Sequence, residues 1–147
     1  MTHSSLLVML VEDNLDHAEL VKRTLSEHRI ACEIIHFHDG QEALDYLMRT
    51  GIYAEPALSP RPHVILLDLR LPRVDGLEVI KLVKASEELR PIPIVILTTS
   101  EAEKDILRAY ENHANSYLVK PVGYEQFVNL MNEFGFYWLG WNMKANL

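Results

Sequence analysis

Five short apolar runs, separated by segments with helical spacing, constrain the fold of this chain more than any other feature. The runs cover residues 6–11, 33–37, 63–67, 92–97 and 116–119. Runs that are apolar at nearly every position, such as 6–11, are typical of strands buried on both faces of a sheet. Strands that alternate with helices form a parallel sheet, so the pattern predicts an α/β, doubly wound (βα)5 fold with five parallel strands.

Polar capping residues and apolar spacing place a helix after each predicted strand. Asn14 or Asp16 caps the first helix, which we expect to run to about residue 29. The other helices are expected at 41–49, from Asp75-Gly76 onward, at 101–112 with Ser100 as cap, and at 124–134. Residues 51–62 contain three prolines and no helical pattern, which predicts a long loop.

Four of the predicted strands end on polar side chains. These are Glu12 and Asp13 after the first strand, Asp68 after the third, Thr98 after the fourth and Lys120 after the fifth. In an open parallel sheet the carboxyl ends of the strands share one edge, where ligands bind. A lone carboxylate at the end of a buried strand costs folding free energy, which indicates a functional acid. The sequence therefore predicts an acidic site that binds a metal ion and accepts a phosphoryl group.

Composition and charge narrow the class of protein. The chain has 147 residues, of which 48% are hydrophobic, and this fits one domain with an adequate core. The formal net charge of −7 argues against nonspecific nucleic-acid binding. No apolar stretch reaches the roughly 18 residues that span a bilayer, and the start lacks the basic region of a signal peptide. We expect a cytoplasmic protein with no membrane and no nucleic-acid partner.

Neither the cysteine nor the histidines form a metal-binding pattern. Cys32 is the single cysteine, so it makes no intrachain disulfide, and we interpret it as a small buried hydrophobic residue in a reducing compartment. The seven histidines lack ligand spacing, and His36 and His38 alternate along a strand. We expect structural or exposed positions for all seven.

The set Glu12-Asp13, Asp68, Thr98 and Lys120-Pro121, each at the end of its own strand and in this order, resembles the receiver domain of two-component response regulators. The resemblance covers the chain from residue 6 to about 134. It implies a flavodoxin-like sheet of order 2-1-3-4-5, in which the first and third strands are neighbours and Asp13 lies next to Asp68. The loop 51–62, the run Thr98-Thr99-Ser100 and the aromatic segment 134–138 resemble the stand-alone regulators of phytochrome-type histidine kinases.

The resemblance implies a role for each residue at the sheet edge. Asp68 is the expected phosphoacceptor, and it takes the phosphoryl group from a sensor histidine kinase. Lys120 and Thr98 are expected to contact the phosphoryl oxygens. The protein is then not an enzyme in the ordinary sense, because it catalyses only its own phosphorylation and dephosphorylation.

The resemblance also implies a Mg²⁺ (or Mn²⁺) cofactor. Asp13 and Asp68 are expected to bind the ion directly, and the backbone carbonyl of Arg70 to supply a further oxygen. Glu12 is expected to act mainly through a bound water. Many members of the family carry aspartate where this chain has Glu12.

The resemblance also implies a conformational change on phosphorylation. Thr98 is expected to move toward the phosphoryl group while the ring of Tyr117 turns inward, which repacks the face formed by the fourth helix, fifth strand and fifth helix. Pro121 resembles the family's cis proline, which aims the preceding lysine inward. Arg70 and Ser100, two residues after Asp68 and Thr98, are expected to flank the attacking water and tune dephosphorylation.

Other functions of the same fold remain open at this point. A flavodoxin-like cofactor binder needs a glycine- and hydroxyl-rich phosphate loop, where this chain has Glu12-Asp13-Asn14. A haloacid-type phosphatase needs a second aspartate two residues after the nucleophile, where this chain has Arg70. A degenerate receiver that acts only as a protein-binding module is the main alternative.

The end of the sequence suggests how the signal leaves the protein. Residues 1–147 are expected to form a single receiver domain with a short aromatic extension at about 134–147, too short for a DNA-binding output domain. Output is then expected through protein contact. The extension carries Phe134, Phe136, Tyr137, Trp138 and Trp141, and we expect a homodimer through the last strand, the last helix and this tail.

Overall fold

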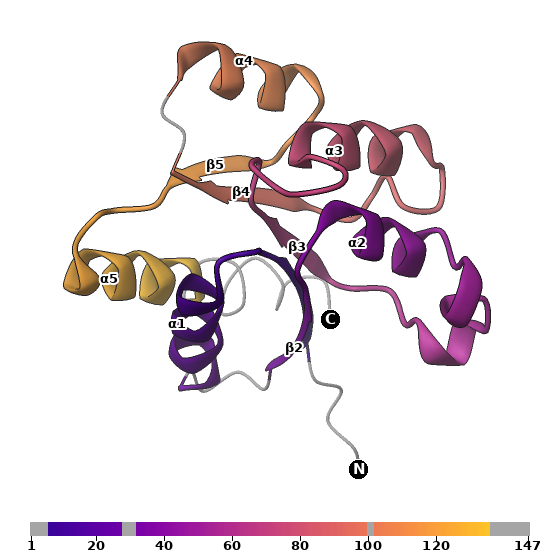
Figure 1. Ribbon diagram of the computed structural model, residues 1–147, viewed down its shortest axis with the longest axis horizontal. Coiled ribbons are helices and arrows are strands. Elements are labelled where there is room, and N and C mark those ends of the chain that lie inside the picture. The colour runs from indigo at the N-terminus through magenta and orange to yellow at the C-terminus, as the bar shows by residue number, and fades with distance from the viewer. Residues whose placement is uncertain (1–5, 28–31, 100–101, 136–147) are drawn as a thin grey trace.

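The sheet forms where the apolar runs predict it. The computed structural model describes residues 6–27, 32–99 and 102–135, and its five parallel strands lie in the order β2-β1-β3-β4-β5 (Figure 1). The strands are β1 (Leu6–Val11), β2 (Cys32–Phe37), β3 (Val64–Leu67), β4 (Ile94–Thr98) and β5 (Ser116–Val119). The predicted doubly wound fold and strand order are confirmed.

Helices cover both faces of the sheet. On one face α1 (Leu15–Ser26) contacts α5 (Tyr124–Phe134), and on the other lie α2 (Gly40–Leu47), α3 (Gly76–Ala85) and α4 (Glu103–Glu111) (Figure 1). Asn14 caps α1, since its side chain accepts a hydrogen bond from the His17 N–H at 3.0 Å. This decides between the two predicted caps. None of the helices within the described residues is long and apolar enough to cross a membrane.

Alternate residues of β1 supply two separate cores. Met9 and Val11 pack with residues of α2, α3 and α4, whereas Leu6, Val8 and Leu10 pack with residues of α1 and α5. Every residue of β1 is buried because helices cover both faces of this central strand. Because both faces of β1 are buried, the strand is apolar throughout. The first polar residues therefore lie just beyond its carboxyl end.

Two segments differ from the sequence-based expectations. The helix predicted from residue 101 begins at Glu103, after Ala102, which has no side-chain cap. Ser100, the predicted cap, lies outside the described residues. The predicted loop 51–62 contains two turns of 3₁₀ helix, η1 (Gly51–Tyr53) and η2 (Pro56–Leu58). Neither turn buries a residue, so the sequence carries no apolar stripe there.

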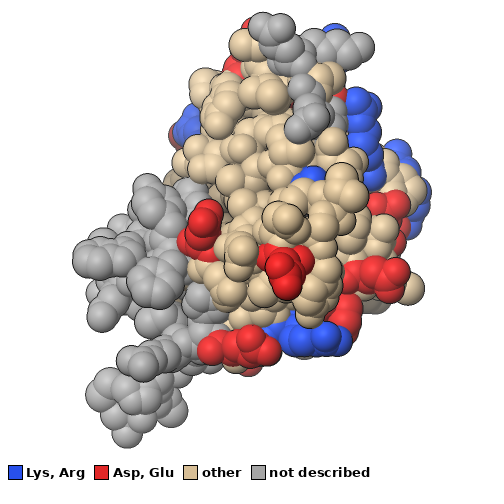
Figure 2. Space-filling view, turned by 90° about the vertical axis from the view of Figure 1, so that its left-hand side faces the viewer, with Lys and Arg blue, Asp and Glu red and all other residues tan. Residues whose placement is uncertain are grey.

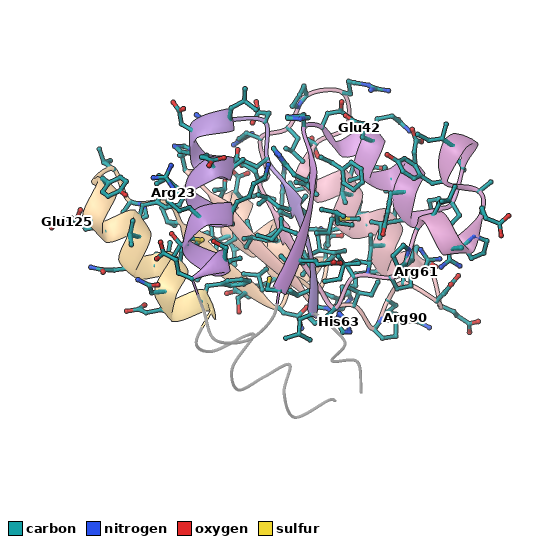
Figure 3. The ribbon with its side chains drawn as sticks, turned by 90° about the horizontal axis from the view of Figure 1, so that it is seen from below. Arg23, Glu42, Arg61, His63, Arg90 and Glu125 are labelled. Atoms are coloured by element: carbon teal, nitrogen blue, oxygen red, sulfur yellow. The ribbon has the colours of Figure 1, made fainter. Side chains whose placement is uncertain are left out.

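The amino ends of the strands carry structural contacts. His63 accepts the Leu7 N–H on Nδ1 at 2.9 Å, and Arg61 donates to the Leu47 carbonyl at 2.6 Å. Figure 3 places His63 and Arg61 at one edge of the molecule and Glu42, in the first turn of α2, at the opposite edge. These contacts tie the long loop to the sheet, and they agree with a structural position for His63.

Candidate functional site

The polar residues that end the strands meet at the carboxyl edge of the sheet. β1 pairs with β3 so that Val11 lies opposite Leu67, and the Asp68 N–H donates to the Val11 carbonyl at 3.1 Å. Glu12 and Asp13 therefore lie beside Asp68. The Lys120 N–H donates to the Thr98 carbonyl at 2.7 Å, which joins the other two strand ends. The sheet order alone brings the predicted site residues together.

Asp68 is a buried carboxylate that accepts hydrogen bonds on both oxygens. Only 7% of the surface of Asp68 is exposed to solvent. Oδ1 accepts from the Thr98 hydroxyl at 2.8 Å and from the Arg70 N–H at 3.0 Å, and Oδ2 accepts from Lys120 Nζ at 3.0 Å. Bonds of this kind to a charged group are short and strong, so they fix the direction in which the carboxylate points.

Lys120 places a buried ammonium group among three acceptors. Its Nζ lies 3.0 Å from Asp68 Oδ2 and 3.0 Å from His17 Nδ1, and it forms an ion pair with Glu12 Oε1. An ammonium group has three N–H donors, and here each has an acceptor. The full set of partners makes a 6% exposed lysine tolerable in the fold.

The Lys120–Pro121 peptide bond is trans, so the expected cis proline at Pro121 is wrong for this structure. Trans is the more stable isomer of an X-Pro bond by about 0.5–1 kcal/mol. Lys120 reaches Asp68 from the trans backbone. A cis bond is therefore not needed to aim this lysine at the site.

Glu12 is the most deeply buried carboxylate of the group, at 1% exposure. Its Oε2 accepts the Asn14 N–H at 3.2 Å, and its backbone carbonyl contacts His36 Nε2 at 2.7 Å. Burial raises the pKa of Glu12 to about 7, against the lowering effect of the Lys120 ammonium group. Glu12 thus changes charge near neutral pH.

The three carboxylates form a group suited to a divalent cation. One oxygen each from Glu12, Asp13 and Asp68 lies within 4.8 Å of the others. Glu12 and Asp68 are buried and Asp13 is exposed, so the group is open to solvent on one side. Carboxylate oxygens in this number are ligands that Mg²⁺ and Mn²⁺ prefer, with water completing the shell. The residues present therefore fit the predicted metal.

Gly76 permits the close approach of α3 to the segment that follows Asp68. A Cβ at this position would lie 2.4 Å from the Asp68 carbonyl oxygen and 2.7 Å from Leu69 Cα. The Gly76 N–H donates to the Leu69 carbonyl at 2.9 Å, and Asp75 caps the helix. Only a residue without a side chain fits there, so the helix start and the site backbone are held together.

The structure adds two residues that the sequence did not indicate. His17 in the first turn of α1 contacts Lys120. Asp105 in α4 forms an ion pair with Arg70, in which Oδ2 lies 2.5 Å from Arg70 Nη2. His17 is the third residue of α1, and no sequence signal joined it to Lys120, which is 103 positions away. No sequence signal marked Asp105. Tyr117, the expected switch residue, is half-buried and packs against the core on the α3 and α4 face.

The comparisons with known proteins indicate one protein family. The family model described as "Response regulator receiver domain" matches residues 8–132. The probable methanogenesis regulatory protein FilR2 of Methanothrix harundinacea is 46% identical over 136 residues, which cover 92% of this chain and 85% of that protein. The response regulator Rcp1 of Synechocystis is 38% identical over 133 residues, covering 90% and 88%.

Solved structures agree with these relatives. The Mn²⁺-bound form of Rcp1 superposes with a TM-score of 0.86 at 38% identity and covers 90% of this chain and 94% of that one. The phosphorylated cyanobacterial phytochrome response regulator RcpA gives a TM-score of 0.88 at 36% identity, with coverage of 92% and 95%.

Proposed function

The chain belongs to the response-regulator receiver family, and on that premise we propose that it is a single-domain regulator whose phosphoacceptor is Asp68. Receiver domains accept a phosphoryl group from histidine kinases and signal through the phosphorylated state. The observation that carries the proposal is the buried Asp68 carboxylate, bonded to Thr98 and Lys120 and flanked by Glu12 and Asp13.

The reaction is a transfer between two energy-rich compounds. An Asp68 oxygen attacks the phosphorus of a phosphohistidine or of an acyl phosphate, and a P–O bond to Asp68 forms. The bond from phosphorus to the imidazole nitrogen or acyl oxygen breaks, and the leaving group takes its electron pair. Lys120 and the Thr98 hydroxyl, which now contact Asp68, are placed to donate to the phosphoryl oxygens.

Mg²⁺ or Mn²⁺ is the cofactor of this site. Glu12, Asp13 and Asp68 would hold the ion, with the backbone carbonyl of Arg70 as a further ligand. When bound, the ion supplies positive charge between the carboxylates and an incoming phosphoryl group, which otherwise repel each other. Asp13, the exposed member, is the first carboxylate that an entering ion meets.

The phosphorylated protein returns to its resting state by its own slow hydrolysis. We place Arg70 beside the attacking water, whereas Ser100, the other residue expected there, lies outside the described residues. The Arg70 guanidinium group is drawn toward α4 by Asp105, at 2.5 Å, and its side chain remains 64% exposed. A bulky cation there screens the aspartyl phosphate from water and lengthens the lifetime of the signal.

The output surface is formed by α4, β5 and α5. Thr98 turns to the phosphoryl group and the half-buried Tyr117 ring moves inward, which changes the packing of this face. Leu107 and Tyr110 on α4 are exposed apolar residues that a partner would cover. We place a homodimer contact here, extended by the aromatic tail, of which residues 136–147 lie outside the described residues.

The upstream partner is a sensor histidine kinase of the phytochrome type in the cytoplasm. RcpA is a phytochrome response regulator, and this similarity supports the assignment. The exposed apolar residues Leu15, Val122 and Tyr124, at the starts of α1 and α5, offer a docking surface for the kinase. Figure 2 shows the α5 side of the molecule, where uncharged residues predominate and charged ones are scattered. No nucleic acid or membrane takes part.

The test is phosphorylation by acetyl phosphate with Mg²⁺, measured as an intact-mass increase of one phosphoryl group. The wild type should gain the group only with the metal, and Asp68→Asn should gain none. Asp45→Asn, which changes a carboxylate in α2, is the matched control and should behave as wild type. A wild type that gains no phosphoryl group would favour the degenerate receiver instead.

The dimer is tested separately by sedimentation. A chain truncated after Gly135 retains Phe134, which is buried in the core. The truncated chain should sediment as a monomer under conditions in which the full chain is a dimer. An unchanged oligomeric state would exclude the tail from the interface.

A further inference from the structure

His17 contacts the site from an element that supplies no other side chain to it. Its Nδ1 lies 3.0 Å from Lys120 Nζ, and His17 is the third acceptor of that ammonium group besides Glu12 and Asp68. We propose that His17 is a positioning residue, which holds the Lys120 ammonium group in the orientation that phosphoryl transfer requires. The inference rests on the proposed function, and it assigns to His17 a part in the same reaction.

Two elements fix the imidazole ring. The backbone N–H of His17 donates to the Asn14 side chain at 3.0 Å, so the imidazole ring extends from the capped first turn of α1. The ring also lies against Phe127 of α5, with centroids 5.5 Å apart and planes inclined by 31°. A ring held from both sides presents Nδ1 in one direction, and that direction is toward Lys120.

The hydrogen bond to Lys120 defines which nitrogen of the His17 ring carries the proton. An ammonium group has no lone pair, so Nδ1 must be the acceptor and the ring proton must lie on Nε2. Burial, and after it the charge of Lys120, lower the pKa of His17 below its ordinary value. The neutral imidazole is therefore the form that faces Lys120 at neutral pH.

The three acceptors of Lys120 differ in one respect. Glu12 and Asp68 belong to the carboxylate group suited to a cation, whereas His17 does not. When an incoming phosphoryl group becomes a partner of Lys120, the carboxylate contacts must change. The His17 contact can persist through this exchange, so it limits the directions in which the flexible lysine side chain can point.

The experiment measures the rate constant of phosphorylation by acetyl phosphate in wild type, His17→Ala and His17→Asn. The alanine variant should react about three- to tenfold more slowly, the range expected for the loss of one hydrogen bond. Asparagine places an oxygen close to the position of Nδ1 and should restore most of the rate. Glu19→Gln, a change of an exposed side chain farther along α1, is the control and should leave the rate unchanged.

A second readout requires no phosphoryl donor. The nitrogen NMR signal of the Lys120 ammonium group should shift in His17→Ala and return toward its wild-type position in His17→Asn. A wild-type rate in His17→Ala would overturn the proposal. So would an equal loss of rate in both variants with an unchanged Lys120 signal, which would indicate packing on Phe127 alone. If the wild type takes no phosphoryl group, the proposed function fails, while the NMR comparison still decides whether His17 orients Lys120.

Discussion

Replacement of Glu12 by glutamine should change how the stability of the metal-free protein depends on pH. Glu12 is buried, and burial raises its pKa from 4.5 to about 7. Between pH 4.5 and 7 the folded protein keeps a proton on Glu12 that the unfolded chain has lost. Because the folded state then binds more protons, its stability falls as pH rises through this window, and the full loss is present above pH 7.

The size of the effect follows from the two pKa values. The gap between 4.5 and about 7 corresponds to about 3 kcal/mol, since one pKa unit is worth about 1.4 kcal/mol. Glutamine keeps the volume of the side chain and can still accept from Lys120, but it does not titrate. The stability of Glu12→Gln relative to wild type should therefore rise by about 3 kcal/mol between pH 4.5 and pH 8.

Urea unfolding with EDTA at several pH values between 4.5 and 8 measures this difference. His17, whose pKa is lowered, contributes an opposite slope, and the comparison of two proteins that share it removes that contribution. Glu19→Gln, a change of an exposed carboxylate on α1, is the matched control and should run parallel to wild type. Parallel curves for wild type and Glu12→Gln would refute the electrostatic account of the site.

Three further predictions follow from particular contacts. Gly76→Ala should lower the free energy of unfolding by about 2 kcal/mol or more, because the new Cβ would lie 2.4 Å from the Asp68 carbonyl oxygen; urea unfolding measures it. Burial raises the pKa of Cys32 to about 11, so native Cys32 should react with a disulfide reagent at pH 8 about 10-fold more slowly than the unfolded chain, because the loss of thiolate outweighs the higher nucleophilicity of the thiolate that remains. Arg70→Ala removes the ion pair to Asp105 and should cost about 1 kcal/mol, with faster amide exchange in α4; unchanged exchange would show that the pair does not hold the helix.

The strands and their polar ends could be predicted from the sequence because a strand buried on both faces is a continuous apolar run. Every residue of β1 and β3 is buried, so both strands are apolar throughout and their ends are sharp. Once the strand order was known, the sheet geometry alone brought Asp13, Asp68, Thr98 and Lys120 to one edge.

The parts that could not be predicted leave no such trace. α4 starts after Ala102 without a side-chain cap, so no capping residue marked its first turn. The expected cis form of Pro121 came from the family resemblance alone, and the Lys120–Pro121 bond found here is trans. The contact of His17 with Lys120 joins residues 103 positions apart, a distance across which neither periodicity nor capping carries information.

The measurement that tests the central claim most directly is the location of the phosphoryl group itself. The protein is treated with acetyl phosphate and Mg²⁺ and then reduced with borohydride, which converts an aspartyl phosphate to homoserine, and the site is read by peptide mass spectrometry. The account predicts homoserine at position 68 and at no other aspartate, and none when the metal is removed with EDTA. Homoserine at another position, or a phosphoryl group on a residue other than Asp68, would contradict it.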